Sequence, residues 1–229
     1  MKMSKRSPFL SNNEAFREPR FKKYDTESHY LEMRDGVKIA IDALIPRGLK
    51  RGEVIPTILI QTRYWRAIQL RKPFSWLLKY STNPLICKKM VKYGYAIVTT
   101  DVRGTGASFG TRPYPVSQDE IKDGGEITDW ITEQAWSNGE VVTWGNSYTG
   151  MTSELAHSLN HPAIKCGIIK HNPWDFFEHA IFPGGCFNEA FTTYWSRLGI
   201  ALDQTHGRAL KEFKPIKPLF AALASKAVK

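Results

Sequence analysis

The sequence WGNSYTG at Trp144–Gly150 decides the fold assignment, because it lies between a predicted strand at 141–144 and a predicted helix at 148–159. A serine on a sharp strand-to-helix turn between small residues has the context of a nucleophile elbow. In such a turn the serine hydroxyl stands clear at the carboxyl edge of the sheet. The first amides of the following helix point to the same place and can stabilise a developing oxyanion. The pattern therefore predicts Ser147 as a nucleophile.

The glycine spacing around Ser147 differs from the common Gly-x-Ser-x-Gly pattern. Gly145 is in its usual place, but the second glycine comes one residue late, at Gly150, and Thr149 takes its position. The turn must then accommodate a β-branched residue or adjust locally. The alternative interpretation is an ordinary serine whose side chain caps the N-terminus of the next helix.

Strands and helices alternate around this motif. Apolar runs at 57–61, 95–100 and 164–169 predict buried strands. Helical spacing of apolar residues over 118–134 predicts a helix, which the pair Gly124-Gly125 weakens. From Gly94 onward the order is strand, helix, strand, helix, strand, which indicates a parallel α/β sheet with right-handed crossovers.

The regions on either side of this α/β pattern have a different character. Residues 29–34 and 37–44 alternate around an Asp-Gly pair and predict an antiparallel hairpin. Residues 62–82 are mixed aromatic and basic, which suggests a loop with a short helix, and 85–93 fit a helix that ends at a glycine. Residues 172–206 are rich in aromatic and small residues and suggest short helices over the sheet.

Charge is unevenly distributed along the chain of 229 residues, whose formal net charge is +10. Residues 1–25 are expected to form a basic extension, and 207–229 a basic tail with six basic side chains and one acidic. The part of the chain between these two ends carries almost no net charge, so no specific nucleic-acid partner is expected. No apolar run is long enough for a membrane span and no secretory signal is visible, which predicts a cytoplasmic protein without membrane contact.

Two further loops follow predicted strands, at the edge where α/β active sites lie. At the start of the glycine-rich loop 103–110, Arg103 is expected to pair with Asp101 just before it and brace the backbone. Tyr64 follows the strand at 57–61, where its hydroxyl could face an oxyanion near Ser147 or its ring could simply pack.

No residue pattern calls for a cofactor or a metal ion. The three cysteines, Cys87, Cys166 and Cys186, are widely spaced and odd in number, so they fit neither a disulfide framework nor a metal site. We expect buried or half-buried free thiols, as in a reducing compartment.

Taken together, the motifs resemble the Xaa-Pro dipeptidyl-peptidase-like α/β-hydrolases, a group that includes cocaine esterase and the α-amino-acid ester hydrolases. The resemblance runs from about Tyr30 to about Asp203. It rests on five stretches, MRDGVK at 33–38, RY at 63–64, DVRGTGAS at 101–108, WSNG at 136–139 and GNSYTG at 145–150. It implies an α/β-hydrolase fold, a mostly parallel sheet with an N-terminal antiparallel hairpin, here incomplete at the C-terminus. The core would span 26–171, and 172–206 would begin a helical cap.

The resemblance also implies roles for individual residues. Ser147 would be acylated, and the backbone N–H of Tyr148 with the hydroxyl of Tyr64 would form the oxyanion hole. Substrates would be small esters or amides, or short peptides from which an N-terminal dipeptide ending in proline is released. The family's acid and histidine come later than this chain extends, and the substitutes inside it are Asp175 and His206.

The sequence thus leaves two hypotheses. The first is a serine hydrolase that works through an acyl-enzyme on Ser147, present as the N-terminal portion of a truncated or frameshifted reading frame. The second is a non-catalytic remnant or binding module without the triad acid and histidine. His157 and His161 are expected to face solvent, and His171 to line the pocket. The sequence does not predict the oligomeric state.

Overall fold

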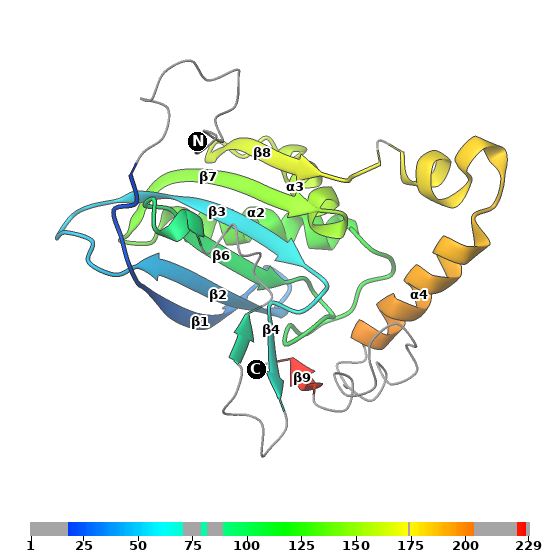
Figure 1. Cartoon of the computed structure of the whole chain (residues 1–229), viewed down its shortest axis with the longest axis horizontal. Coiled ribbons are helices and arrows are strands. Elements are labelled where there is room, and N and C mark those ends of the chain that lie inside the picture. The colour runs from blue at the N-terminus through cyan, green and yellow to red at the C-terminus, as the bar shows by residue number, and fades with distance from the viewer. Residues whose placement is uncertain (1–17, 71–78, 82–88, 174, 204–223, 228–229) are drawn as a thin grey trace, which may run out of the picture.

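The computed structural model describes residues 18–70, 79–81, 89–173, 175–203 and 224–227. Its main feature is a six-stranded mixed sheet with the order β1-β2-β6-β3-β7-β8 (Figure 1). The strands are β1 (Tyr24–Glu32), β2 (Lys38–Pro46), β3 (Ile55–Thr62), β6 (Ala96–Asp101), β7 (Ser137–Asn146) and β8 (Ile164–Lys170).

The strand directions confirm the predicted sheet. β1 and β2 form an antiparallel hairpin, and β2 also pairs antiparallel with β6. The remaining neighbours, β6 with β3, β3 with β7 and β7 with β8, are parallel. Four strands therefore end at the same edge, and the loops that follow them come together there.

Apolar residues of the central strands alternate between two buried faces. Leu59 and Val98 face one side, in a core cluster with Ile127 and Ile131 of helix α2 (Gln118–Thr132). On the other side Ile58, Ile60 and Ile97 pack with Val91, which belongs to a helical segment at 89–91. This two-sided burial is typical of parallel strands covered by helices.

The first glycine of the pair in α2 lies close to the sheet. A Cβ atom on Gly124 would lie 2.7 Å from Oε1 of Gln61 on β3, so any larger residue there would require the Gln61 side chain to shift. α2 begins at Ser117, whose side chain accepts a hydrogen bond from the N–H of Glu120. Gly124, which weakens the helical pattern in the sequence, thus gives α2 close packing against Gln61.

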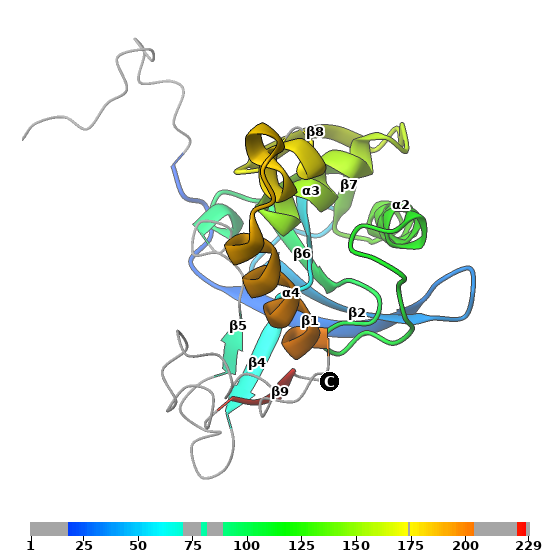
Figure 2. The same cartoon turned by 90° about the vertical axis from the view of Figure 1, so that its right-hand side faces the viewer.

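After β8 the chain leaves the sheet and forms helical structure beside it. A π-helical turn at Phe177–Ile181 and a 3₁₀ turn at Pro183–Gly185 lead to α4 (Glu189–Asp203). In Figure 1, α4 lies on the side to which β3, β7 and β8 point. Figure 2, viewed from that side, shows α4 in front of the sheet.

The described part of the region expected to be a loop with a short helix contains two strands. β4 (Ala67–Leu70) and β5 (Lys79–Ser81) pair antiparallel, and β9 (Ala224–Ala227), in the expected tail, pairs antiparallel with β4. Residues 71–78 lie outside the described residues, as do 85–88 of the helix expected at 85–93. The sequence AIQL alternates only briefly, which gives a weak strand signal.

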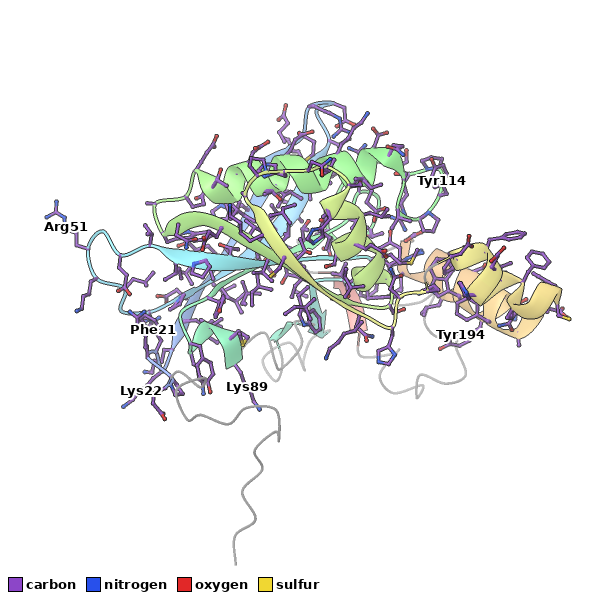
Figure 3. The ribbon with its side chains drawn as sticks, turned by 90° about the horizontal axis from the view of Figure 1, so that it is seen from above. Phe21, Lys22, Arg51, Lys89, Tyr114 and Tyr194 are labelled. Carbon is purple, nitrogen blue, oxygen red and sulfur yellow. The ribbon has the colours of Figure 1, made fainter. Side chains whose placement is uncertain are left out.

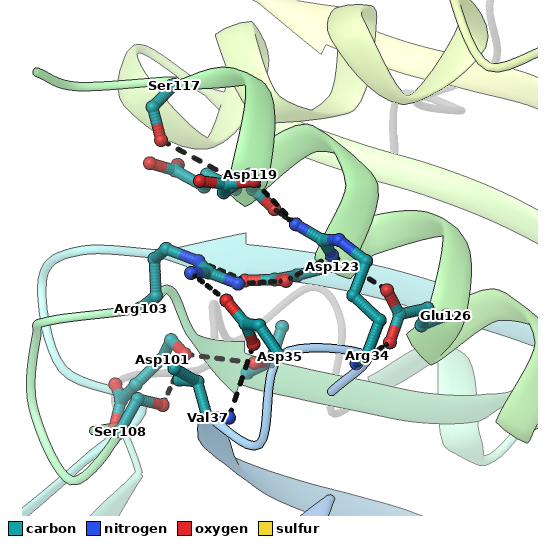
Figure 4. Close-up of polar contacts among 12 residues, drawn as sticks. Arg34, Asp35, Val37, Asp101, Arg103, Ser108, Ser117, Asp119, Asp123 and Glu126 are labelled. Atoms are coloured by element: carbon teal, nitrogen blue, oxygen red, sulfur yellow. Dashed lines mark hydrogen bonds and ion pairs between the residues drawn. The ribbon is translucent and has the colours of Figure 1, made fainter. Parts of the chain in front are cut away.

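Asp101 and Arg103 do not pair, contrary to expectation. The Arg66 guanidinium binds Asp101 at 2.8 Å, and Arg103 binds Asp123 of α2 at 2.5 Å and Asp35 at 2.8 Å. Figure 4 shows Arg103 reaching Asp35 and Asp123. β6 ends at Asp101, so strand alternation ends there and the two side chains leave in different directions.

The turn between β7 and α3 (Tyr148–His157) is very tight. A Cβ atom on Gly145 would lie 1.8 Å from the carbonyl oxygen of Thr149, and one on Gly150 would lie 2.9 Å from that of Lys170. Thr149 closes the turn, because its hydroxyl accepts a hydrogen bond from the N–H of Asn146 at 2.6 Å and donates one to the carbonyl of Asn146 at 2.9 Å. The β-branched residue is therefore part of the turn.

Gly145→Ala is expected to prevent this turn from forming, because a backbone oxygen occupies the space that the methyl group needs. We expect a loss of stability of about 3 kcal/mol or more. Gly125→Ala is the matched control, since its Cβ would meet only the side chain of Leu159, at 3.3 Å. Chemical denaturation compares the two, and equal stability would contradict this account of the turn.

Asp123→Asn is expected to destabilise the protein by about 3 kcal/mol, because it leaves the buried Arg103 without its main counterion. The control is Asp119→Asn on the same helix. Asp119 binds Arg34 at 2.7 Å, but its side chain is 54% exposed, so the expected loss is under about 1 kcal/mol. A loss for Asp123→Asn as small as that for Asp119→Asn in urea denaturation would contradict the importance of the buried pair.

Candidate active site

Ser147 has the backbone conformation of a strained turn residue. Its φ of 59° and ψ of −124° are unusual for a residue with a side chain, and such conformations cost roughly 1–3 kcal/mol and concentrate at functional sites. Its N–H donates to the carbonyl of Lys170 on β8 at 2.9 Å. The side chain is exposed and makes no capping hydrogen bond, which contradicts the alternative of an ordinary capping serine.

Tyr148 is the first residue of α3, directly after Ser147. Its backbone N–H has no acceptor within the helix, because the first amides of any helix lack one. Its side chain is 1% exposed, and the hydroxyl donates to Glu120 of α2 at 2.5 Å. Burial, with the neighbouring Glu120 carboxylate second, raises the pKa of Tyr148 far above its usual value.

Tyr64 lies close to this turn. Its ring and that of Tyr148 meet edge to face, with centroids 6.0 Å apart. Its N–H donates to the hydroxyl of Thr62, the last residue of β3, at 2.9 Å. The side chain is half-buried. The two aromatic residues that the resemblance links to an oxyanion hole are thus neighbours beside Ser147.

The segment after Tyr64 is held by contacts that the sequence did not reveal. Trp65 has a φ of 64°, is 1% exposed, and donates from Nε1 to the carbonyl of Leu202 on α4 at 3.0 Å. Arg66 donates from its N–H and its guanidinium to the two oxygens of Asp101, at 2.6 and 2.8 Å. Burial raises the pKa of Asp101, and Arg66 opposes that rise.

A cleft of about 250 Å³ lies between α4 and the loop at 112–115. Arg63 lies on its wall, with its guanidinium 5.4 Å from the Tyr148 ring centroid and 5.1 Å from that of Trp195. Arg63 and Arg112 share Asp203, the last residue of α4, at 3.2 and 2.9 Å. Figure 3 shows Tyr114, another lining residue, at the end of the molecule that carries α4.

The candidate acid and histidine do not meet Ser147 in the part of the chain that the structure describes. Asp175 is exposed and accepts the N–H of Glu178 at 2.9 Å, while His206 lies outside the described residues. No described histidine hydrogen-bonds to Ser147. His157 lies 3.2 Å from the hydroxyl of Thr143, against the expectation that it faces solvent.

The other two histidines of interest also lack a contact with Ser147. His161 is half-buried and lies 2.9 Å from a carboxylate oxygen of Asp129 on α2, so the expectation that it faces solvent is also wrong. His171 has a φ of 47° and is exposed, directly after β8. The role expected for His171 as a pocket-lining residue stays a prediction.

The cysteines differ from expectation. Cys166 and Cys186 are free and exposed, and Cys87 lies outside the described residues. Cys166 lies on β8, the last strand in the described sheet order, where Ile168 and Ile169 are also 44% and 42% exposed. Within the described ranges, no group of His, Cys, Asp or Glu could hold a metal ion, and no helix is long and apolar enough to cross a membrane.

The chain resembles known hydrolases in sequence. The family model described as X-Pro dipeptidyl-peptidase (S15 family) matches residues 35–226. A Mycobacterium bovis protein named as a candidate serine esterase is 44% identical over 81% of this chain and 31% of its own length. The cocaine esterase of a Rhodococcus species is 31% identical over 72% of this chain and 27% of its own length. The chain thus spans about a third of the length of these relatives.

Solved structures agree with the sequence matches. A CocE/NonD family hydrolase from Staphylococcus aureus superposes with a TM-score of 0.67 at 26% identity, over 79% of this chain and 34% of that one. An α-amino-acid ester hydrolase gives a TM-score of 0.55 at 27% identity, over 77% of this chain and 30% of that one. Since the family model matches most of the chain, this protein belongs to the X-Pro dipeptidyl-peptidase (S15) family of α/β-hydrolases.

Proposed function

We propose that this chain provides the nucleophile and the oxyanion donors of a serine hydrolase that cleaves esters or amides through an acyl-enzyme on Ser147. The observation that carries the proposal is the conformation of Ser147. The residue is strained and exposed, stands at the edge where the parallel strands end, and keeps its hydroxyl out of any capping bond. A serine that served only to begin α3 would not need that strain.

In the proposed reaction, Oγ of Ser147 attacks the carbonyl carbon of the substrate, and its proton passes to a base. The negative charge develops on the carbonyl oxygen, where the N–H of Tyr148 and the hydroxyl of Tyr64 donate hydrogen bonds to it. The base then returns the proton to the leaving oxygen or nitrogen, the carbonyl carbon's bond to that atom breaks, and a neutral alcohol or amine departs from an acyl ester on Ser147. Water hydrolyses that ester and restores the serine.

The base is not among the described residues that contact Ser147. We place it either at His206, which lies outside the described residues, with Asp175 as its acid, or on polypeptide that corresponds to the remaining length of the relatives. Without a base the serine hydroxyl is a weak nucleophile at neutral pH, and only the oxyanion hole and substrate binding would accelerate the reaction.

The cleft beside Arg63 is the proposed place for the acyl or leaving group. Residues 172–206 would begin a cap over it, and α4 forms one wall. Relatives are named as a cocaine esterase and an α-amino-acid ester hydrolase, and the family as X-Pro dipeptidyl-peptidase. We therefore propose a small ester, amide or short peptide as substrate, with no nucleic-acid or membrane partner. We also propose a cytoplasmic location, because the two cysteines within the described residues are free thiols and not a disulfide.

A binding module without turnover is the second candidate. It is favoured by one observation, namely that no described histidine hydrogen-bonds to Ser147. Such a module would still use the cleft between α4 and the loop at 112–115. It predicts ligand binding that is unchanged by removal of the serine hydroxyl, together with no covalent adduct.

In protein that also carries the base, a fluorophosphonate probe is expected to form one covalent adduct on Ser147, because the elbow presents the activated hydroxyl beside two oxyanion donors. Ser147→Ala should abolish the adduct. Ser158→Ala is the control, since Ser158 is an exposed serine at the other end of α3, and it should label like the wild type. Intact-mass and peptide mass spectrometry measure the result. Equal labelling of the wild type and Ser147→Ala would overturn the proposed function.

Tyr64→Phe is expected to slow labelling by about 10²-fold, as the loss of one oxyanion donor typically does. The ring would remain and keep its edge contact with Tyr148. Tyr24→Phe, on the exposed side of β1, is the control and should leave the rate unchanged. The measurement is the second-order rate constant of labelling. An unchanged rate in Tyr64→Phe would remove this hydroxyl from the mechanism.

A further inference from the structure

We infer that Glu120 is a positioning residue, which acts through the side chain of Tyr148 to fix the backbone N–H of Tyr148 at the oxyanion site. The inference rests on the proposed function of Ser147 and Tyr148. It adds a residue from α2, 27 positions before Ser147, that does not touch the reacting atoms.

The contacts around the Tyr148 hydroxyl form a closed set. The hydroxyl donates to Oε1 of Glu120 at 2.5 Å. The N–H of Val116 lies between them, 3.2 Å from the hydroxyl oxygen and 3.1 Å from Oε2 of Glu120. A hydroxyl with both a donor and an acceptor in fixed places has little freedom to rotate or shift.

Val116 reaches this place at a cost. Its φ is 55°, and a β-branched residue at positive φ is a genuine outlier. Glycine would adopt this conformation without strain. In this strained conformation the Val116 N–H points at Glu120 and Tyr148. We therefore interpret the strained loop as part of the same hydrogen-bonded arrangement.

Burial and charge add to the argument. Glu120 and Tyr148 are each 1% exposed, and burial raises the pKa of Glu120. The hydrogen bond from Tyr148 lowers that pKa in turn, as do two arginines, Arg112 at 4.0 Å from Oε2 and Arg63, which also faces the Tyr148 ring. A buried carboxylate is costly unless it is paired and hydrogen-bonded. Here the groups that offset this cost also surround the first residue after the nucleophile.

The side chain of Tyr148 can transmit this constraint to its own backbone. Its ring contacts the Arg63 guanidinium at 5.4 Å and the Tyr64 ring at 6.0 Å, and its hydroxyl is anchored on α2. Glu120 in turn lies in the first turn of α2, next to the capping Ser117. The loop that carries Tyr64 and the helix that begins at Tyr148 are thus fixed to one point, so the two oxyanion donors keep their relative position.

The test is a comparison of Tyr148→Phe, Glu120→Gln and the double variant. Tyr148→Phe keeps the ring and loses the anchor, so we expect fluorophosphonate labelling to slow by about tenfold or more. For an activated ester, kcat should fall while KM stays within about twofold. Glu120→Gln keeps an acceptor for the Tyr148 hydroxyl, so it should slow labelling and lower kcat less than Tyr148→Phe does. The double variant should resemble Tyr148→Phe, because the two residues act as one unit.

The control is Tyr30→Phe, which removes a hydroxyl bonded to the carbonyl of Ala107, in a different part of the molecule. It should label at the wild-type rate. Unchanged kcat in Tyr148→Phe, a change confined to KM, or additive effects of the two substitutions would each overturn the inference.

A second measurement separates this inference from the proposed function. Amide hydrogen exchange of the peptide that covers 145–151 needs no activity, and it should be faster in Tyr148→Phe and unchanged in Tyr30→Phe. If the wild type and Ser147→Ala label equally, the proposed function fails, and exchange alone decides on Glu120. If the wild type labels on Ser147 but Tyr148→Phe matches it in rate and exchange, only the positioning role fails.

Discussion

Between Gly145 and Thr149 the chain leaves no space for a Cβ atom, because β7 turns into α3 within a few residues. This steric constraint places Ser147 at positive φ and holds its side chain away from the helix end that it would otherwise cap. The hydrogen bond from Ser147 to Lys170 ties the turn to β8, so a neighbouring parallel strand also fixes its position. The exposed hydroxyl follows from backbone geometry and does not depend on any side-chain partner within the described residues.

Buried ion pairs determine how the surrounding loops approach that turn. Arg66 with Asp101 fixes the end of β3 to the end of β6, and Arg103 with Asp123 fixes the loop after β6 to α2. Asp203 connects α4 to the core through two arginines. Such pairs add little net stability compared with apolar packing, but they are highly directional. Their value here is that they bring together loops from four different parts of the sequence.

Sequence patterns predicted the parts of the fold that depend on local periodicity. The parallel strands, the hairpin at Asp35-Gly36 and the turn at Ser147 all follow from alternation, glycine placement and strand-to-helix order. The pairing of Asp101 with Arg66 could not be predicted, because which of several nearby arginines meets a carboxylate depends on the path of the loop. The same holds for Trp65, whose positive φ has no sequence signature.

The candidate site was predictable to a similar extent. Ser147, Tyr64 and Tyr148 stand out by motif and resemblance, and the structure brings their segments together. Glu120 does not stand out, because an acidic residue in the first turn of a helix is ordinary. Its role depends on the strained conformation of Val116 and on a contact across 28 residues of sequence.

The central claim is that Ser147 attacks the substrate and that the N–H of Tyr148 and the hydroxyl of Tyr64 hydrogen-bond to the resulting oxyanion. A crystal structure of the fluorophosphonate adduct tests it most directly. The account predicts phosphorus bonded to Oγ of Ser147, with its unesterified oxygen about 2.7–3.1 Å from both the N–H nitrogen of Tyr148 and the hydroxyl oxygen of Tyr64. An adduct on another residue, or a phosphoryl oxygen that points away from both donors, would contradict it.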